Sequence, residues 1–168
     1  MTLVRQGRST YAMVVLPGAP LAAQHGAEEL QQHLEAMTGA RLLIVSHDDA
    51  IARRLPRGVT PGHFITLGAA PAHAGLTDEA FHLQTHGTQL AIVEGGARGT
   101  LYGCYALLED VLGVRWFTPH CTHILPRLVV RDELRALSPT VTESDRHGWG
   151  LRDLPPVRLS GGVCGGGQ

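Results

Sequence analysis

The chain has 168 residues, enough for one domain with a substantial hydrophobic core. Its net charge of −1 at pH 7 and its 5% aromatic content argue against a nucleic-acid partner, since they provide neither a basic surface nor many stacking rings. No apolar run approaches the roughly 18 residues that a membrane-spanning helix needs, so no membrane partner is expected. The apolar run at 11–16 resembles a signal sequence only loosely, because Pro17 and Gly18 end it early, and the compartment stays open.

The first half of the chain predicts short strands around one long helix. Residues 11–16, 41–45 and 63–67 are apolar runs typical of buried strands. Between the first two, apolar residues recur at alternating spacings of four and three, which predicts a helix over 20–38. Its buried face should consist of Ala23, Ala27, Leu30, Leu34 and Met37. The polar residues of the same helix, among them Glu29, Gln31 and His33, are expected to face solvent, and a short helix is predicted around 49–55.

The second half predicts a hairpin, a second helix and further short strands. Segments 81–85 and 90–93 flank Gly87 and are typical of an antiparallel hairpin. Residues 98–112 then show helical spacing, with a shared face of Leu101, Tyr105, Leu108 and Leu112 and a stop at Gly113. Short strands are predicted at 114–117, 124–125 and 128–130. The resulting fold class is a mixed α/β (α+β) domain over residues 1–137, with a mostly antiparallel sheet and two main helices on one face. Residues 138–168 predict an extended or disordered tail, because glycine and proline replace the periodic apolar pattern.

The turn at 95–100 has two interpretations. It follows a strand and opens a helix, a context in which Gly96, Arg98, Gly99 and Thr100 could bind an anion through backbone N–H groups. However, no Lys-Ser/Thr pair follows, and the glycine spacing is not that of a dinucleotide-binding loop. We therefore favour the simpler interpretation, in which these glycines form a tight turn that lets the helix lie close to the sheet.

Other chemistry finds little support in the sequence. Three cysteines are an odd number without framework spacing, so a disulfide scaffold is not expected. The densest cluster of metal-ligand types, His120-Cys121-Thr122-His123, lacks a second pair at a suitable distance, and neither a metal nor a cofactor is predicted. No nucleophile motif is present. Glu94, Glu109 and Asp110 could in principle form an acid–base pair, but Glu109 and Asp110 are neighbours near the end of a helix and are expected to be solvated.

Arg115, Trp116 and Phe117 form the one concentration of aromatic rings beside a cation. Aromatic faces can stack on sugar rings, and a guanidinium can bind a carboxylate through two hydrogen bonds. The alternative, which we favour from the residues alone, is that Trp116 and Phe117 fill the core where the strand joins the sheet.

The stretch from Arg98 to Pro119, RGTLYGCYALLEDVLGVRWFTP, resembles a motif of bacterial glycoside-hydrolase-like proteins. These proteins carry an N-terminal domain like that of the α-glucuronidases of glycoside hydrolase family 67, which is also similar to the non-catalytic second domain of β-hexosaminidases. The helical run at 27–39, the segment Ile65-Thr-Leu-Gly68 and the hairpin before Gly95 resemble the same family. The resemblance covers about residues 11–130, and His120 departs from it, since the family usually has glycine there.

In that family the domain precedes a (β/α)₈ barrel that holds the catalytic carboxylates and typically needs ~250 residues. The resemblance therefore implies a non-catalytic accessory domain of a carbohydrate-active protein, with a catalytic barrel and a polysaccharide as partners. Tyr102, Arg115 and Trp116 are the residues expected to contact sugar, and the chain alone is not expected to be an enzyme. An apolar surface left uncovered by the barrel would favour self-association. The tail departs from the family, as in a truncated gene product, and the alternative function is a small anion-binding module at Gly95–Thr100.

Overall fold

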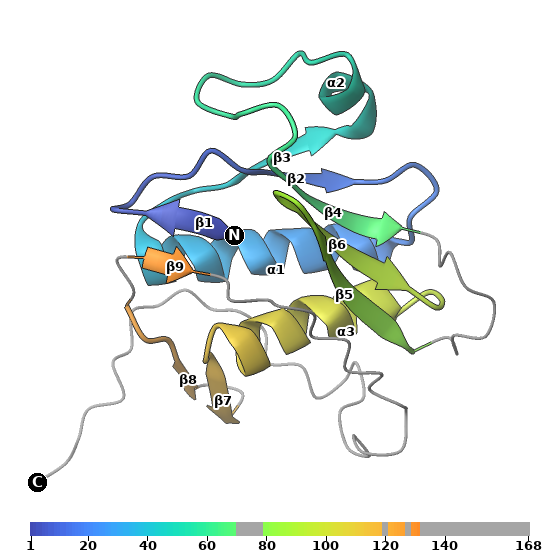
Figure 1. Cartoon of the computed structure of the whole chain (residues 1–168). Helices are drawn as coiled ribbons and strands as arrows, with labels where there is room; N and C mark the ends of the chain where they lie inside the picture. The colour runs from blue at the N-terminus through green and yellow to red at the C-terminus, as the bar shows by residue number, and fades with distance from the viewer. Residues whose placement is uncertain (70–78, 119–120, 127–128, 132–168) are drawn as a thin grey trace, which may run out of the picture.

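The computed structural model describes residues 1–69, 79–118, 121–126 and 129–131 (Figure 1). Its centre is a five-stranded sheet in the order β3-β2-β4-β6-β5. The strands are β2 (Ala12–Val15), β3 (Leu43–Ser46), β4 (Phe64–Ala69), β5 (Phe81–His86) and β6 (Gln89–Glu94). These bounds agree closely with the predicted strands, and Gly87 closes the β5–β6 hairpin at a φ of +59°.

The mixed α+β class is confirmed, but the prediction of a mostly antiparallel sheet is wrong. The pairs β2–β3, β2–β4 and β4–β6 are parallel, and only β5–β6 is antiparallel. The reason lies in the connection between β2 and β3, where an 18-residue helix lies between two strands that pair with each other. Such a crossover returns the chain to the same end of the sheet and makes the two strands parallel.

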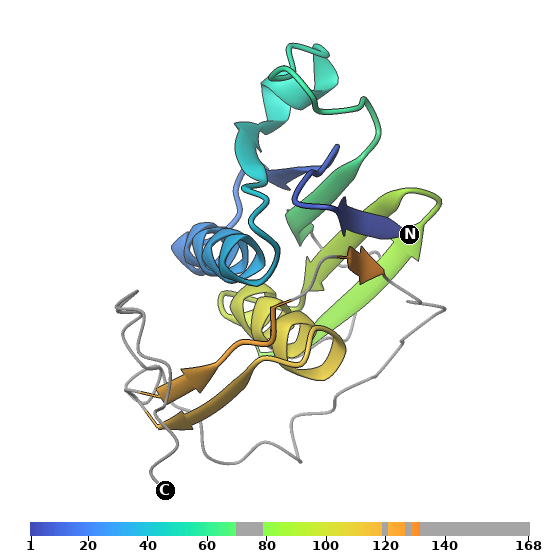
Figure 2. The same ribbon diagram turned by 90° about the vertical axis from the view of Figure 1, so that its left-hand side faces the viewer.

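Two helices cover one face of this sheet, as predicted (Figure 2). Helix α1 (Leu21–Thr38) begins after Pro20 and ends at Gly39, whose φ of +75° and N–H bond to Glu35 O form the usual left-handed stop. Helix α3 (Gly99–Ala106) continues as a π-helical turn, η1 (Leu107–Val111). The helices approach closely at Gly26, where a Cβ atom would lie 2.9 Å from Cys104 Sγ. The predicted leucines of both helices are buried: Leu30, Leu34, Leu101, Leu108 and Leu112.

Short elements complete the described chain. Strand β1 (Thr2–Arg5), which the sequence did not predict, pairs with β9 (Val129–Arg131). Strand β7 (Arg115–Thr118) pairs with β8 (Cys121–His123) to form a two-stranded ribbon. Helix α2 (His47–Ile51) begins two residues before the predicted short helix, because the Ser46 side chain accepts a hydrogen bond from the Asp49 N–H and caps it there. In the described part of the chain, no helix is long and apolar enough to cross a bilayer. The predicted tail at 138–168 lies outside the described residues.

Candidate functional site

Four side chains from three elements meet where α1, α3 and β7 converge, and we call them the Trp116 cluster: Glu29, His33, Tyr105 and Trp116. The Trp116 ring system contacts the rings of His33 and Tyr105, with centroid distances of 5.7 and 5.4 Å. The interplanar angles of 65° and 78° are those of edge-to-face contacts, an arrangement that aromatic rings favour. The cluster thus fixes the start of β7 to both helices.

Glu29 is the unusual member of the Trp116 cluster. Its side chain is 5% exposed, and its Oε2 atom is buried without a hydrogen-bond partner in the described part of the chain. His33 Nδ1 lies 3.8 Å from this oxygen and 2.9 Å from the backbone oxygen of Glu29. Because a carbonyl oxygen can only accept, Nδ1 is the protonated ring nitrogen. Burial raises the pKa of Glu29, while His33, His25 and a hydrogen bond donated by Tyr105 act in the opposite direction. The same burial and the nearby carboxylate raise the pKa of Tyr105.

The prediction that Glu29, Gln31 and His33 face solvent is therefore wrong. Each of the three is at most 8% exposed. Helix α1 packs against the sheet on one side and against α3 on another, so more than one stripe of its surface is buried. The i, i+4 spacing of Glu29 and His33 is the sequence feature that could have indicated this pair. A carboxylate and an imidazole at this spacing lie on the same face of a helix and can interact.

Replacing Glu29 with glutamine should flatten the pH dependence of stability. A carboxyl group whose pKa is raised in the folded state binds protons more tightly there, so stability falls as pH rises from the ordinary glutamate range through the folded pKa. Glutamine keeps an acceptor for Tyr105 and cannot ionise. We expect Glu29→Gln to gain stability relative to the wild type between pH 4.5 and pH 7.5, measured by urea unfolding. The exposed neighbour Glu28→Gln is the control, and parallel curves for the wild type and Glu29→Gln would contradict the expectation.

The residues expected to contact sugar are only partly brought together. Trp116 is half-buried in the cluster, and Arg115 precedes it on β7. The Arg115 guanidinium donates to the backbone oxygens of Glu109 (2.6 Å) and Val114 (2.9 Å), which holds it at the end of η1. Tyr102 is half-buried on α3 and packs against the core, and the rings that contact Trp116 among the described residues are those of His33 and Tyr105. Sugar contact by these three residues remains a prediction.

Phe117 does not fill the core as expected, since it is 67% exposed. Neighbouring residues of a strand point to opposite faces, so a strand that turns Trp116 inward turns Phe117 outward.

The glycine-rich turn is engaged mainly with its own chain. The N–H of Gly95 donates to Ala80 O, and that of Gly99 donates to Gly96 O. Arg98 pairs with Glu79 at 3.5 Å, and the Thr100 side chain is fully buried. The close approach of helix to sheet occurs one turn later, at Gly103, where a Cβ atom would lie 2.5 Å from Ile92 Cγ2. Anion binding by Gly96, Arg98, Gly99 and Thr100 remains a prediction.

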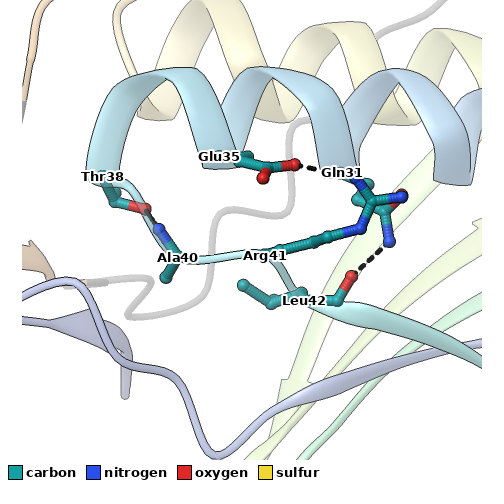
Figure 3. Close-up of polar contacts among 6 residues, drawn as sticks. All are labelled: Gln31, Glu35, Thr38, Ala40, Arg41 and Leu42. Carbon is teal, nitrogen blue, oxygen red and sulfur yellow. Dashed lines mark hydrogen bonds and ion pairs between the residues drawn. The ribbon is translucent and has the colours of Figure 1, made fainter.

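A groove of about 630 Å³ lies between α1 and the chain leading into β3. Figure 3 shows its two sides joined by side chains: Gln31 donates to Leu42 O, and Glu35 pairs with Arg41 at 3.1 Å. Thr38 also accepts the N–H of Ala40 at the end of the helix. The groove therefore offers carboxylate, amide and guanidinium groups beside the apolar residues Ala36 and Ile44, and sequence analysis did not identify it.

Metal-ligand side chains are dispersed in the described segments. No three of their His, Cys, Asp or Glu residues lie together as a metal site requires. Of the cluster singled out in the sequence, Cys121 and His123 lie on β8, and His120 falls outside the described residues.

Comparison with known proteins finds distant similarity to solved structures. No family model and no curated protein matches the chain. Among solved structures, the chain is similar to a GH138 enzyme targeting pectin rhamnogalacturonan II, with a TM-score of 0.42 and 16% sequence identity. The match covers 60% of this chain and 10% of that one, so the chain spans about a tenth of the length of that structure.

Proposed function

We propose that this chain is a non-catalytic accessory domain of a carbohydrate-active protein of the α-glucuronidase type. It packs against a catalytic (β/α)₈ barrel and contacts polysaccharide near β7. The observation that carries the proposal is the unit formed by the β5–β6 hairpin, α3 and β7, which is continuous in the chain and bears the RGTLYG to RWFTP motif.

The residues of that motif pack helices and strands together. The resemblance therefore supports a shared type of domain and not a shared active site. Gly103 allows α3 to approach β6. Leu101, Leu108 and Leu112 are buried, and Arg115 holds the carbonyl end of η1. A motif that specifies how a helix packs on a sheet identifies a type of fold. The function of the domain must be argued from its binding or catalytic residues.

The closed Trp116 cluster supports a non-catalytic role. It has a carboxyl group of raised pKa, a histidine and a tyrosine, which are the usual components of acid–base chemistry. A general acid or base must come within about 3 Å of a substrate atom. The Glu29 and His33 side chains are only 5% and 3% exposed, so substrate cannot reach them without opening the helix pair.

Titration with sugars, followed by NMR, tests the contact. In a Trp149→Phe variant, Trp116 supplies the one indole N–H signal. We expect this signal to shift saturably with a glucuronic-acid-substituted xylo-oligosaccharide. Arg115→Gln should weaken binding of this acidic sugar and leave binding of the neutral xylo-oligosaccharide unchanged, because only the acid offers a carboxylate to the guanidinium.

Two results would contradict the assignment. One is an indole signal that stays in place up to tens of millimolar sugar. The other is a shift confined to the groove residues Gln31 and Arg41, which would place the sugar in the groove instead of at the assigned residues.

A further inference from the structure

The β7–β8 ribbon has one face turned to the core and one turned to solvent. Trp116 and Ile124 are half-buried and pack against the core. Arg115, Phe117 and His123 are exposed, because neighbouring residues of a strand point to opposite sides. Arg115 pairs directly opposite His123, and the Phe117 ring lies beside the His123 ring, with a centroid distance of 6.4 Å. We call these three exposed residues the outer ribbon face.

We propose that the outer ribbon face binds a uronic acid residue of a polysaccharide, with the sugar ring stacked on Phe117 and the carboxylate bound by Arg115 and His123. The inference rests on the proposed function and goes further, because it names the class of sugar and adds two residues to the site. Trp116 then lies behind the binding residues, on the other side of the same strand, and holds the ribbon to the helices.

The Arg115 guanidinium is held in place and still has hydrogen-bond donors to offer. Its Nη1 group donates to the backbone oxygens of Glu109 and Val114. A guanidinium also carries N–H groups on Nε and Nη2, which form the edge that binds a carboxylate through two hydrogen bonds. Within the described residues Arg115 forms no ion pair. Because the group is already fixed, binding a carboxylate costs it little conformational freedom.

Phe117 is the extra residue of a β-bulge. The register of β7 against β8 shifts between Trp116 and Thr118, so Phe117 has no ladder partner opposite it. A bulge re-aims a side chain, and here the ring is 67% exposed and inclined at 50° to that of His123. The bulge therefore presents an aromatic ring to solvent beside an imidazole and a guanidinium. Such a ring offers the apolar CH groups of a sugar a surface on which to pack.

The spacing of these groups suits a uronic acid. Side chains two residues apart on one face of a strand, such as those of Arg115 and Phe117, lie about 7 Å apart. In a pyranose ring stacked on Phe117, the C6 carboxylate oxygens lie roughly 4 Å from the ring centre, and a hydrogen bond adds about 2.8 Å. The same carboxylate can accept from His123, since an imidazole keeps an N–H donor in either protonation state. The outer ribbon face has a cation and no carboxylate of its own, so it is complementary to an acidic sugar.

Titration of the isotope-labelled chain with sugars, followed by two-dimensional NMR, tests the proposal. The ligands are the glucuronic-acid-substituted xylo-oligosaccharide and its neutral counterpart. We expect His123→Ala to weaken binding of the acidic sugar about tenfold and to leave the neutral sugar unchanged. Phe117→Ala should weaken binding of both sugars about fivefold, because both stack on the ring.

Helix α2 lies at the opposite end of the molecule from the ribbon (Figure 1) and supplies matched controls. Ile51 of α2 is 68% exposed, nearly the same fraction as Phe117, and Arg54 just after α2 is an exposed arginine. Ile51→Ala and Arg54→Gln should bind both sugars as the wild type does. Thermal unfolding checks that every variant folds, and the two ribbon variants are independent of each other.

Three results would overturn the proposal, and they separate it from the proposed function. Wild-type affinity for the acidic sugar in both Phe117→Ala and His123→Ala would remove the sugar from the outer ribbon face and leave the accessory role intact. The absence of binding of either sugar to the wild type would overturn the proposal and the proposed sugar contact together. Inorganic phosphate that displaces the acidic sugar at equal concentration would show an anion site without preference for a uronic acid.

Discussion

Replacing Gly68 with alanine is expected to destabilise the fold by about 3 kcal/mol. Gly68 lies in β4 at the register shift between Leu67 and Ala69, and its φ is +78°. An L-residue in the left-handed region costs roughly 1–2 kcal/mol. An added Cβ would also overlap the side chain of Ala19 just before α1, and overpacking costs roughly 1–3 kcal/mol. Urea unfolding followed by circular dichroism measures the loss.

Gly18→Ala is the matched control, because Gly18 has the same φ of +78° with open space around its Cα. It should lose only the roughly 1–2 kcal/mol that the backbone conformation costs. The difference between the two variants then measures the contact of β4 with the start of α1. Equal losses in both variants would show that the contact at Ala19 is not tight.

Replacing Gly103 with valine should destabilise the fold by a similar amount, about 3 kcal/mol. A Cβ at this position would lie 2.5 Å from Ile92 Cγ2 and 3.3 Å from Phe81 Cδ2, so the branched side chain of valine would push α3 off the hairpin. The small gain in helix propensity over glycine offsets only a few tenths of a kcal/mol. The free energy of unfolding, from the same urea assay, is the measurement.

A double-mutant cycle that combines Gly103→Val with Ile92→Ala separates the steric overlap with Ile92 from other effects of the substitution on stability. Ile92 is fully buried, and truncating it opens the space that the new side chain needs. The double variant should be more stable than the sum of the two single losses predicts, by about 1 kcal/mol or more. Additive losses would mean that Gly103 is required for another reason than its approach to β6.

Local patterns in the sequence were sufficient to predict α1, the β5–β6 hairpin and the helix that begins at Gly99. In each case periodicity and a glycine stop act within one segment, so no distant contact is needed to fix the element. Strand β1 was missed because its partner strand is β9, where Val4 pairs with Val130, more than 120 residues away in the chain. The parallel direction of β3 was missed although the helical crossover before it was predicted.

The Trp116 cluster shows the same limit at the level of side chains. Sequence analysis grouped Trp116 and Arg115 with Tyr102. In the structure, the side chains that surround Trp116 in the cluster are those of Tyr105, Glu29 and His33. Those partners come from α1 and α3, and their meeting depends on how closely Gly26 lets the two helices approach. The spacing of apolar residues predicts one buried stripe on α1. Because α1 packs against both the sheet and α3, polar residues outside that stripe are buried as well.

The most direct test of the accessory role is turnover by the purified chain, measured with aryl α-glucuronides and a panel of aryl glycosides. A domain whose carboxyl–histidine pair is closed to substrate should release aglycone at the rate of the buffer, at every chain concentration and at pH values from 4.5 to 7.5. The Glu29→Gln variant should give the same baseline. Release that rises in proportion to the chain and falls in Glu29→Gln would contradict the account, because it would make the Trp116 cluster an active site.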